Sequence, residues 1–228
     1  MIAESGSVSG MSTRLIDETV EPAIHGYLDE PERANGDGVV LAHGAGSNCQ
    51  AKLLIEVSAA LAGCGFTVLR IDLAFRVTRP TGPPRPGDAA RDREGLRRAA
   101  GLLKGKVPGR IFVGGHSYGG RQASMLAADD AGSMDGLLLL SYPLHPPRKP
   151  TELRTKHLGK IGKPAFFAHG TRDPFGSIAE MKAALKLLRV RHELLAIEGA
   201  GHDLAVKKSV SGAVGQVAAA FGAFAGNS

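Results

Sequence analysis

The stretch VGGHSYGGRQASMLAA, residues 113–128, places one serine among glycines, between an apolar run and small residues at helical spacing. Within it, residues 115–119 read G-x-S-x-G. Between a strand and a helix, this pattern makes a sharp turn that exposes the serine hydroxyl. The alternative is a helix cap in a phosphate-binding loop, but no P-loop lysine and no G-x-G-x-x-G motif is present. The stretch therefore predicts Ser117 as a nucleophile.

The order of the expected elements indicates an α/β fold. Continuous apolar runs separated by helical stretches are typical of a parallel sheet with helices on both faces. A short antiparallel pair, 14–16 with 23–28, is expected at the sheet edge. Strands are expected at 39–42, 66–71, 110–114, 137–140, 165–168 and 193–197, helices at 49–63, 88–104, 177–189 and 207–225, and a proline-rich loop at 74–87.

A serine nucleophile needs a base, and the base needs an acid that orients it. Asp173 follows the strand at 165–168, and His202 lies in a glycine-flanked turn after the strand at 193–197. Ligand sites in such sheets form outside the carboxyl ends of the strands, so both are expected to meet Ser117 there. Asp173 precedes a proline and could instead cap a helix. Glu198, at a strand end, is the reserve acid.

The stretch HGAG at 43–46 follows the first buried strand and precedes a helix. Small residues let the backbone approach a substrate and aim N–H groups at a developing negative charge. By this reasoning the backbone N–H groups of Ala45 and Tyr118 form an oxyanion hole. His43 is expected to brace the loop. The alternative is a plain glycine turn.

Composition bounds the class of protein. The 228 residues fit one domain at 12–228 behind a flexible leader at 1–11, with no apolar run long enough to span a membrane and no secretory signal. The cytoplasm is the expected location. The net charge of +6 comes without a nucleic-acid-binding motif, and only 5% of residues are aromatic, so no nucleic-acid partner is expected.

Cys49 and Cys64 lie at the two ends of a predicted helix, too far apart for a disulfide, so they are expected to be buried and unpaired.

Positive charge clusters in two loops expected beside the nucleophile. Arg76, Arg79 and Arg85 follow the strand at 66–71, and Arg148, Lys149, Arg154 and Lys156 follow the strand at 137–140. We therefore expect Arg76 and Arg148 to bind an anionic part of the substrate. The alternative is a solvated basic rim without preference.

With these motifs placed, the chain resembles small α/β-hydrolases near the dienelactone hydrolases. HGAG, GGHSYGGR, LSYPLHPP and HGTRDPFG carry the resemblance over roughly residues 36–225. A eukaryotic subunit of a histone acetyltransferase complex resembles the same branch. The resemblance implies Ser117, Asp173 and His202 as a catalytic triad, with an oxyanion hole at Ala45 and Tyr118. Because dienelactone hydrolases use cysteine as nucleophile, their substrates are not carried over.

These features predict an α/β-hydrolase fold without a substantial cap domain, because only about 20 residues separate Leu144 from Pro164. The predicted function is a serine hydrolase that cleaves a small carboxylic ester or thioester without a metal or organic cofactor. The alternatives are a scaffold that keeps the fold without turnover and a peptidase or transacylase with the same triad. The oligomeric state stays open.

Overall fold

The computed structural model describes residues 11–226, and the residues of the expected leader before Met11 lie outside this range. Met11 itself is the first residue of a strand. The elements are β1 Met11–Asp17, β2 Ile24–Glu30, β3 Gly38–Ala42, α1 Lys52–Gly63, β4 Thr67–Ile71, α2 Ala74–Thr78, α3 Asp88–Lys104, β5 Ile111–His116, α4 Tyr118–Asp129, η1 Ala131–Ser133, β6 Gly136–Leu140, η2 Leu158–Lys160, β7 Ala165–Gly170, α5 Ile178–Leu185, β8 His192–Ile197 and α6 Ser211–Gly226.

One eight-stranded sheet, in the order β1-β2-β4-β3-β5-β6-β7-β8, forms the centre of the described chain. β1 and β2 form the expected antiparallel pair, and β2 is antiparallel to β4. The remaining neighbours are parallel. The carboxyl ends of β3, β5, β6, β7 and β8 therefore lie along one edge, where ligand sites of such sheets form.

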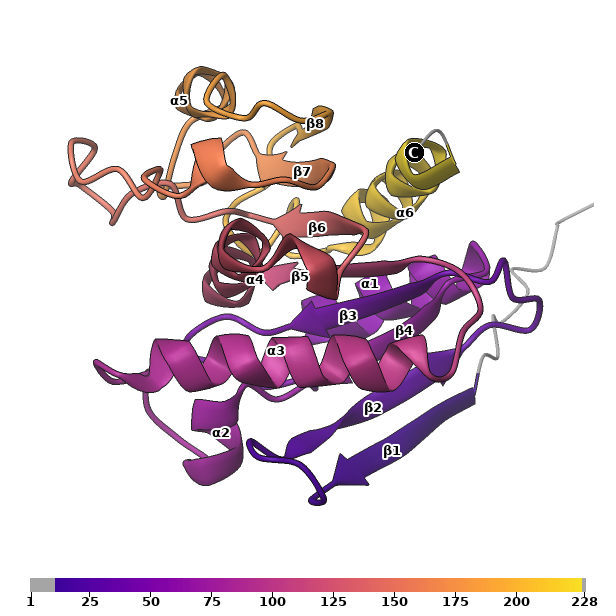
Figure 1. Cartoon of the computed structure of the whole chain (residues 1–228). Helices are drawn as coiled ribbons and strands as arrows, with labels where there is room; N and C mark the ends of the chain where they lie inside the picture. The colour runs from indigo at the N-terminus through magenta and orange to yellow at the C-terminus, as the bar shows by residue number, and fades with distance from the viewer. Residues whose placement is uncertain (1–10, 227–228) are drawn as a thin grey trace, which may run out of the picture.

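Helices cover both faces of the sheet, as the continuous apolar strands predict. Figure 1 shows α3 and α4 on one face and α1 and α6 on the other. Successive side chains of one strand pack into the two hydrophobic cores on opposite faces of the sheet. In β6, Leu137 and Leu139 pack into the core that contains residues of α3 and α4, and Leu138 and Leu140 into the core that contains residues of α1 and α6. Because side chains alternate across a strand, burial on both faces requires an unbroken apolar run.

Three local expectations need correction. The segment 74–87 is not loop throughout, because α2 occupies Ala74–Thr78; every proline of the segment lies beyond it, so none interrupts its hydrogen bonds. The first helix begins at Lys52, so Cys49 lies outside it. Both cysteines are unpaired, but Cys64 is exposed at the end of α1.

The connection between β6 and β7 holds only the three-residue η2 among its described elements, so no cap domain covers the sheet edge. The connection extends beyond the carboxyl ends of the strands (Figure 1). No helix in residues 11–226 combines the length and the apolar character that crossing a membrane would require.

Candidate active site

The turn between β5 and α4 presents Ser117. This residue has φ 52° and ψ −114°, a strained backbone conformation for a residue with a side chain. A Cβ on Gly115 would lie 2.1 Å from the carbonyl oxygen of Ala42, and one on Gly119 would lie 2.6 Å from that of His43. The glycines of the motif thus allow the turn to pack directly on the end of β3.

Hydrogen bonds join Ser117, His202 and Asp173. The Ser117 Oγ lies 2.8 Å from His202 Nε2, and His202 Nδ1 lies 2.8 Å from Asp173 Oδ2. Since a carboxylate accepts, Nδ1 carries the proton and the Nε2 lone pair accepts from the serine hydroxyl. The Asp173 side chain is fully buried, and its other oxygen accepts from the N–H of Phe175. The ends of β5, β7 and β8 thus bring a serine, an aspartate and a histidine into one hydrogen-bonded chain, an arrangement that is able to activate a serine hydroxyl.

The reserve acid lies elsewhere. Glu198 is exposed, and its carboxylate accepts a 3.5 Å hydrogen bond from the Thr171 hydroxyl instead of contacting His202. The carboxylate that contacts His202 in this structure is therefore that of Asp173.

A second serine–histidine contact involves Ser124, which lies within α4, two helical turns after Ser117. The Ser124 Oγ is 2.8 Å from His157 Nε2, and its hydroxyl also donates to the backbone carbonyl of Arg121. Burial lowers the pKa of His157 to about 4. Ser124 is completely buried, so a substrate carbonyl cannot reach it.

The loop after β3 faces Ser117. The buried His43 braces it, as predicted, because Nδ1–H donates to the Gly44 carbonyl and Nε2 accepts from the N–H of Leu73. Burial lowers the pKa of His43 and keeps this tautomer neutral. Among the backbone hydrogen bonds outside regular elements, neither the Ala45 nor the Tyr118 N–H of the described chain donates to a protein acceptor.

An open cleft of about 480 Å³ contains Ser117 and no cap covers it. The loop after β3, the start of α1 and the turn after β8 that carries His202 form its walls. Its lining includes Gly44, Ala45, Lys52, Ser117, Phe175 and His202.

A family model described as alpha/beta hydrolase domain matches residues 35–221. The chain belongs to the α/β hydrolase family.

Solved structures agree with this assignment at the level of the fold. Dienelactone hydrolase from Anabaena variabilis is 21% identical, with a TM-score of 0.72 over 93% of this chain and 97% of that one. A serine hydrolase without a lid from Xanthomonas campestris is 15% identical, with a TM-score of 0.66 over 95% and 96%. An esterase from Pyrococcus furiosus is 17% identical, with a TM-score of 0.73 over 95% and 91%. The hydrolase thus has the lidless form of the fold.

The two arginines expected to bind substrate, Arg76 and Arg148, differ in burial. Arg76 is nearly buried, and its guanidinium donates to the carbonyls of Ser47 at 2.7 Å, Gly82 at 2.9 Å and Arg79 at 3.1 Å. These backbone carbonyls accept from the Arg76 guanidinium, which thereby braces the loop after β3; that Arg76 binds an anionic part of the substrate stays a prediction. Arg148 is exposed on the β6–β7 connection, outside the cleft lining.

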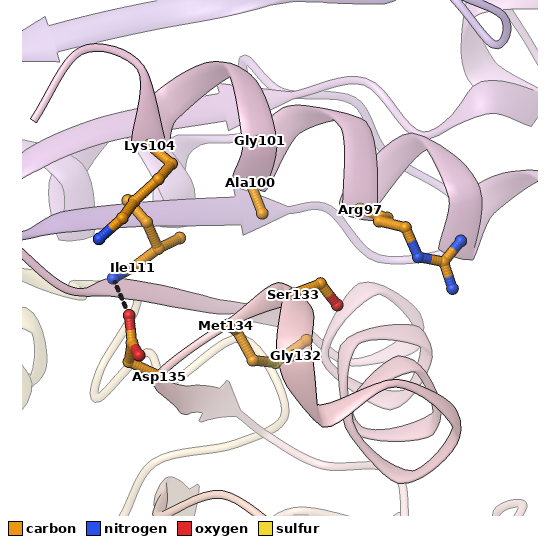
Figure 2. A pocket seen from close by; sticks show the side chains of 9 residues that line it. All are labelled: Arg97, Ala100, Gly101, Lys104, Ile111, Gly132, Ser133, Met134 and Asp135. Carbon is orange, nitrogen blue, oxygen red and sulfur yellow. Dashed lines mark hydrogen bonds between the residues drawn. The ribbon is translucent and has the colours of Figure 1, made fainter.

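A second cavity, of about 340 Å³, lies between α3 and the start of β5, away from the strand ends that carry Ser117. Figure 2 shows its lining, which includes Arg97, Lys104, Ile111, Ser133, Met134 and Asp135. Its charged groups have protein partners: Asp135 accepts from the Ile111 N–H, Lys104 donates to a carbonyl, and Arg97 pairs with Asp130. Each of these three charged side chains therefore has a partner within the protein.

Sequence reasoning missed three side chains that organise the site. Asp92, buried on α3, accepts from the Tyr118 hydroxyl at 2.7 Å and from the Phe75 N–H. The Phe175 ring lies 4.1 Å from the His202 ring at 30°. His116 contacts the His202 carbonyl. Two of these residues lie within motifs that the sequence shows: Phe175 in DPFG and His116 in G-x-S-x-G. For Asp92 the sequence offers no such signal.

Proposed function

We propose that this α/β hydrolase cleaves a carboxylic ester or thioester through an acyl-enzyme on Ser117. The hydrogen-bonded chain from Ser117 through His202 to the buried Asp173 carries the proposal, because it makes a serine nucleophilic. The esterases and the dienelactone hydrolase among the similar structures support the reaction class.

The chemistry runs in two halves. His202 Nε2 takes the hydroxyl proton while Ser117 Oγ attacks the carbonyl carbon, and the carbonyl oxygen becomes an oxyanion held by the N–H groups of Ala45 and Tyr118. When the intermediate collapses, the bond to the leaving group breaks and His202 protonates that group. A water, deprotonated by His202, then attacks the acyl carbon; the bond from that carbon to Ser117 Oγ breaks, His202 returns the proton to Oγ, and the acid leaves. This sequence needs no metal or organic cofactor.

The burial of the Asp173 carboxylate favours an enzyme rather than a scaffold that keeps the fold without turnover. A fully buried carboxylate is costly unless its partners satisfy it, and here the His202 ring and the Phe175 N–H do so. A scaffold has no need to maintain that arrangement. A peptidase or transacylase would use the same atoms and differ only in the leaving group or the acceptor.

The test is turnover of a panel of small esters, thioesters and peptide amides by the wild type, Ser117→Ala and the matched control Ser124→Ala. We expect ester or thioester hydrolysis that Ser117→Ala lowers by about 10⁴-fold or more and that Ser124→Ala retains. Hydrolysis that survives Ser117→Ala would overturn the proposal, and wild-type turnover of amides alone would make the protein a peptidase.

We further propose that the preferred substrate is anionic. Lys52 lines the cleft with its side chain 75% exposed, and Arg148, Lys149 and Lys156 are exposed on the β6–β7 connection at the same edge of the sheet. Arg121, one helical turn after Ser117, has a buried Nε without a hydrogen-bond partner. Lys52 pairs with Glu56 at 3.7 Å and Lys149 with Glu152 at 2.8 Å, so the charges that an anionic substrate would compensate are chiefly those of Arg148 and Lys156.

The anionic preference is tested by kcat/KM for a neutral ester and its carboxylate analogue at low and high salt. We expect the analogue to be preferred at low salt, and the preference to shrink as salt screens the exposed charges. Lys52→Ala and Arg148→Ala should weaken it, whereas Lys106→Ala, an exposed lysine in the turn before β5, should not. Equal kcat/KM values at both salt concentrations would contradict the anionic preference.

A further inference from the structure

His116 connects the nucleophile to the turn that carries the base. It is the last residue of β5 and directly precedes Ser117. Its Nε2 lies 2.8 Å from the backbone carbonyl oxygen of His202, and the two imidazole rings lie 5.0 Å apart at 50°. One side chain therefore ties the strand of the nucleophile to the backbone of the base.

The partner of His116 Nε2 fixes its tautomer. A carbonyl oxygen can only accept, so Nε2 carries the hydrogen and Nδ1 keeps its lone pair. Burial, together with the nearby His202, lowers the pKa of His116 to about 4. The ring therefore stays neutral, with the same donor, near neutral pH.

The ring of His116 also borders the loop after β3, at Gly44. A Cβ on Gly44 would lie 3.1 Å from His116 Nδ1, closer than ordinary van der Waals contact. Glycine at position 44 thus leaves room for the imidazole. The side chain is packed between the loop after β3 and the turn after β8, which limits its freedom to turn away from the His202 carbonyl.

The turn that carries His202 requires such an anchor. Gly199 has φ 72° and Leu204 has φ 58°, so the left-handed region is used on both sides of the base. Of the described residues, His116 is the hydrogen-bond donor to the His202 carbonyl. Both imidazole nitrogens of His202 must meet partners at 2.8 Å, and this geometry depends on where the backbone of residue 202 is held.

We infer that His116 is a positioning residue: its Nε2–H, donated to the His202 carbonyl, holds the base between Ser117 and Asp173. The inference rests on the proposed function. Although His116 is among the residues that line the cleft, the inference assigns it no hydrogen bond to the substrate and no proton transfer. Its effect is on the rate of the chemical steps, because the proton moves between Ser117 and His202 in each of them.

The experiment compares His116→Leu, which removes the donor, with His116→Gln, whose amide nitrogen can reach the position of Nε2. The sites are counted by fluorophosphonate titration, so that kcat refers to folded, reactive enzyme. We expect His116→Leu to lower kcat about tenfold, the scale of one buried hydrogen bond, with KM within about twofold. His116→Gln should return kcat to within about threefold of wild type.

If His116→Leu does not fold, His116→Asn takes its place, because its shorter side chain carries an amide but cannot reach the His202 carbonyl in the same way. Wild-type kcat in the variants without the donor would overturn the inference. So would a glutamine variant no better than leucine, or a loss confined to KM or to the number of reactive sites. Turnover that survives Ser117→Ala would instead overturn the proposed function, so the two failures are distinguishable.

Discussion

The substitution Arg76→Leu tests whether Arg76 has a structural or a substrate-binding role. The substitution removes three hydrogen bonds of 3.1 Å or less to backbone carbonyls of the loops at 44–47 and 79–82. At about 1 kcal/mol each, their loss lowers the free energy of unfolding by about 3 kcal/mol. For a domain of this size that corresponds to a fall in Tm of about 6 to 12 °C.

The assay pairs thermal unfolding with kcat/KM for a neutral ester and its carboxylate analogue. Because Arg76 supports the loop that carries the Ala45 N–H, kcat should fall by the same factor for both esters. Arg85→Leu, in the exposed part of the same segment, is the matched control and should change neither Tm nor kcat. An unchanged Tm in Arg76→Leu, with a loss confined to the anionic ester, would refute the structural role and restore substrate binding.

Three further predictions follow from the geometry. Asp173→Asn should lower kcat by about 10⁴-fold, because the amide no longer fixes the tautomer of the base, while Glu198→Gln stays near wild type; the reverse result would make Glu198 the acid. Burial raises the pKa of Asp92 above its ordinary 3.8, so the free energy of unfolding should fall as pH rises through the raised pKa, and Asp92→Asn should remove this part of the pH dependence; a pH–Tm curve that Asp92→Asn leaves unaltered would contradict it. In the native protein a thiol reagent should label Cys64 quickly and Cys49 only on unfolding, because Cys49 is buried and its pKa is raised to about 12; equal labelling rates would contradict the described burial.

Much of the fold could be predicted because the signals are local. Runs such as Leu137–Leu140 are apolar on both faces of the strand, and that requires helices on both sides of the sheet. The positions of Asp173 and His202 could be predicted for a related reason. Parallel strands bring their carboxyl ends together, so residues that follow different strands meet even though 29 residues separate these two.

The partners of individual side chains could not be predicted in the same way. Nothing in the sequence around Arg76 shows that its donors meet backbone carbonyls, so its charge suggested a ligand instead. Asp92 and Tyr118 lie on different helices, and their hydrogen bond depends on how α3 packs beside α4. Backbone acceptors carry no sequence signal, and contacts to them emerge only from the folded chain.

The most direct test of the central claim is mass-spectrometric mapping of the protein after incubation with a fluorophosphonate, which reacts with an activated serine hydroxyl. We predict a single stoichiometric adduct on the peptide that contains Ser117, abolished by Ser117→Ala and greatly slowed by His202→Ala, with Ser124→Ala labelled like wild type. An adduct that persists in Ser117→Ala, or a wild-type protein that forms none, would contradict the claim that Ser117 is an activated nucleophile.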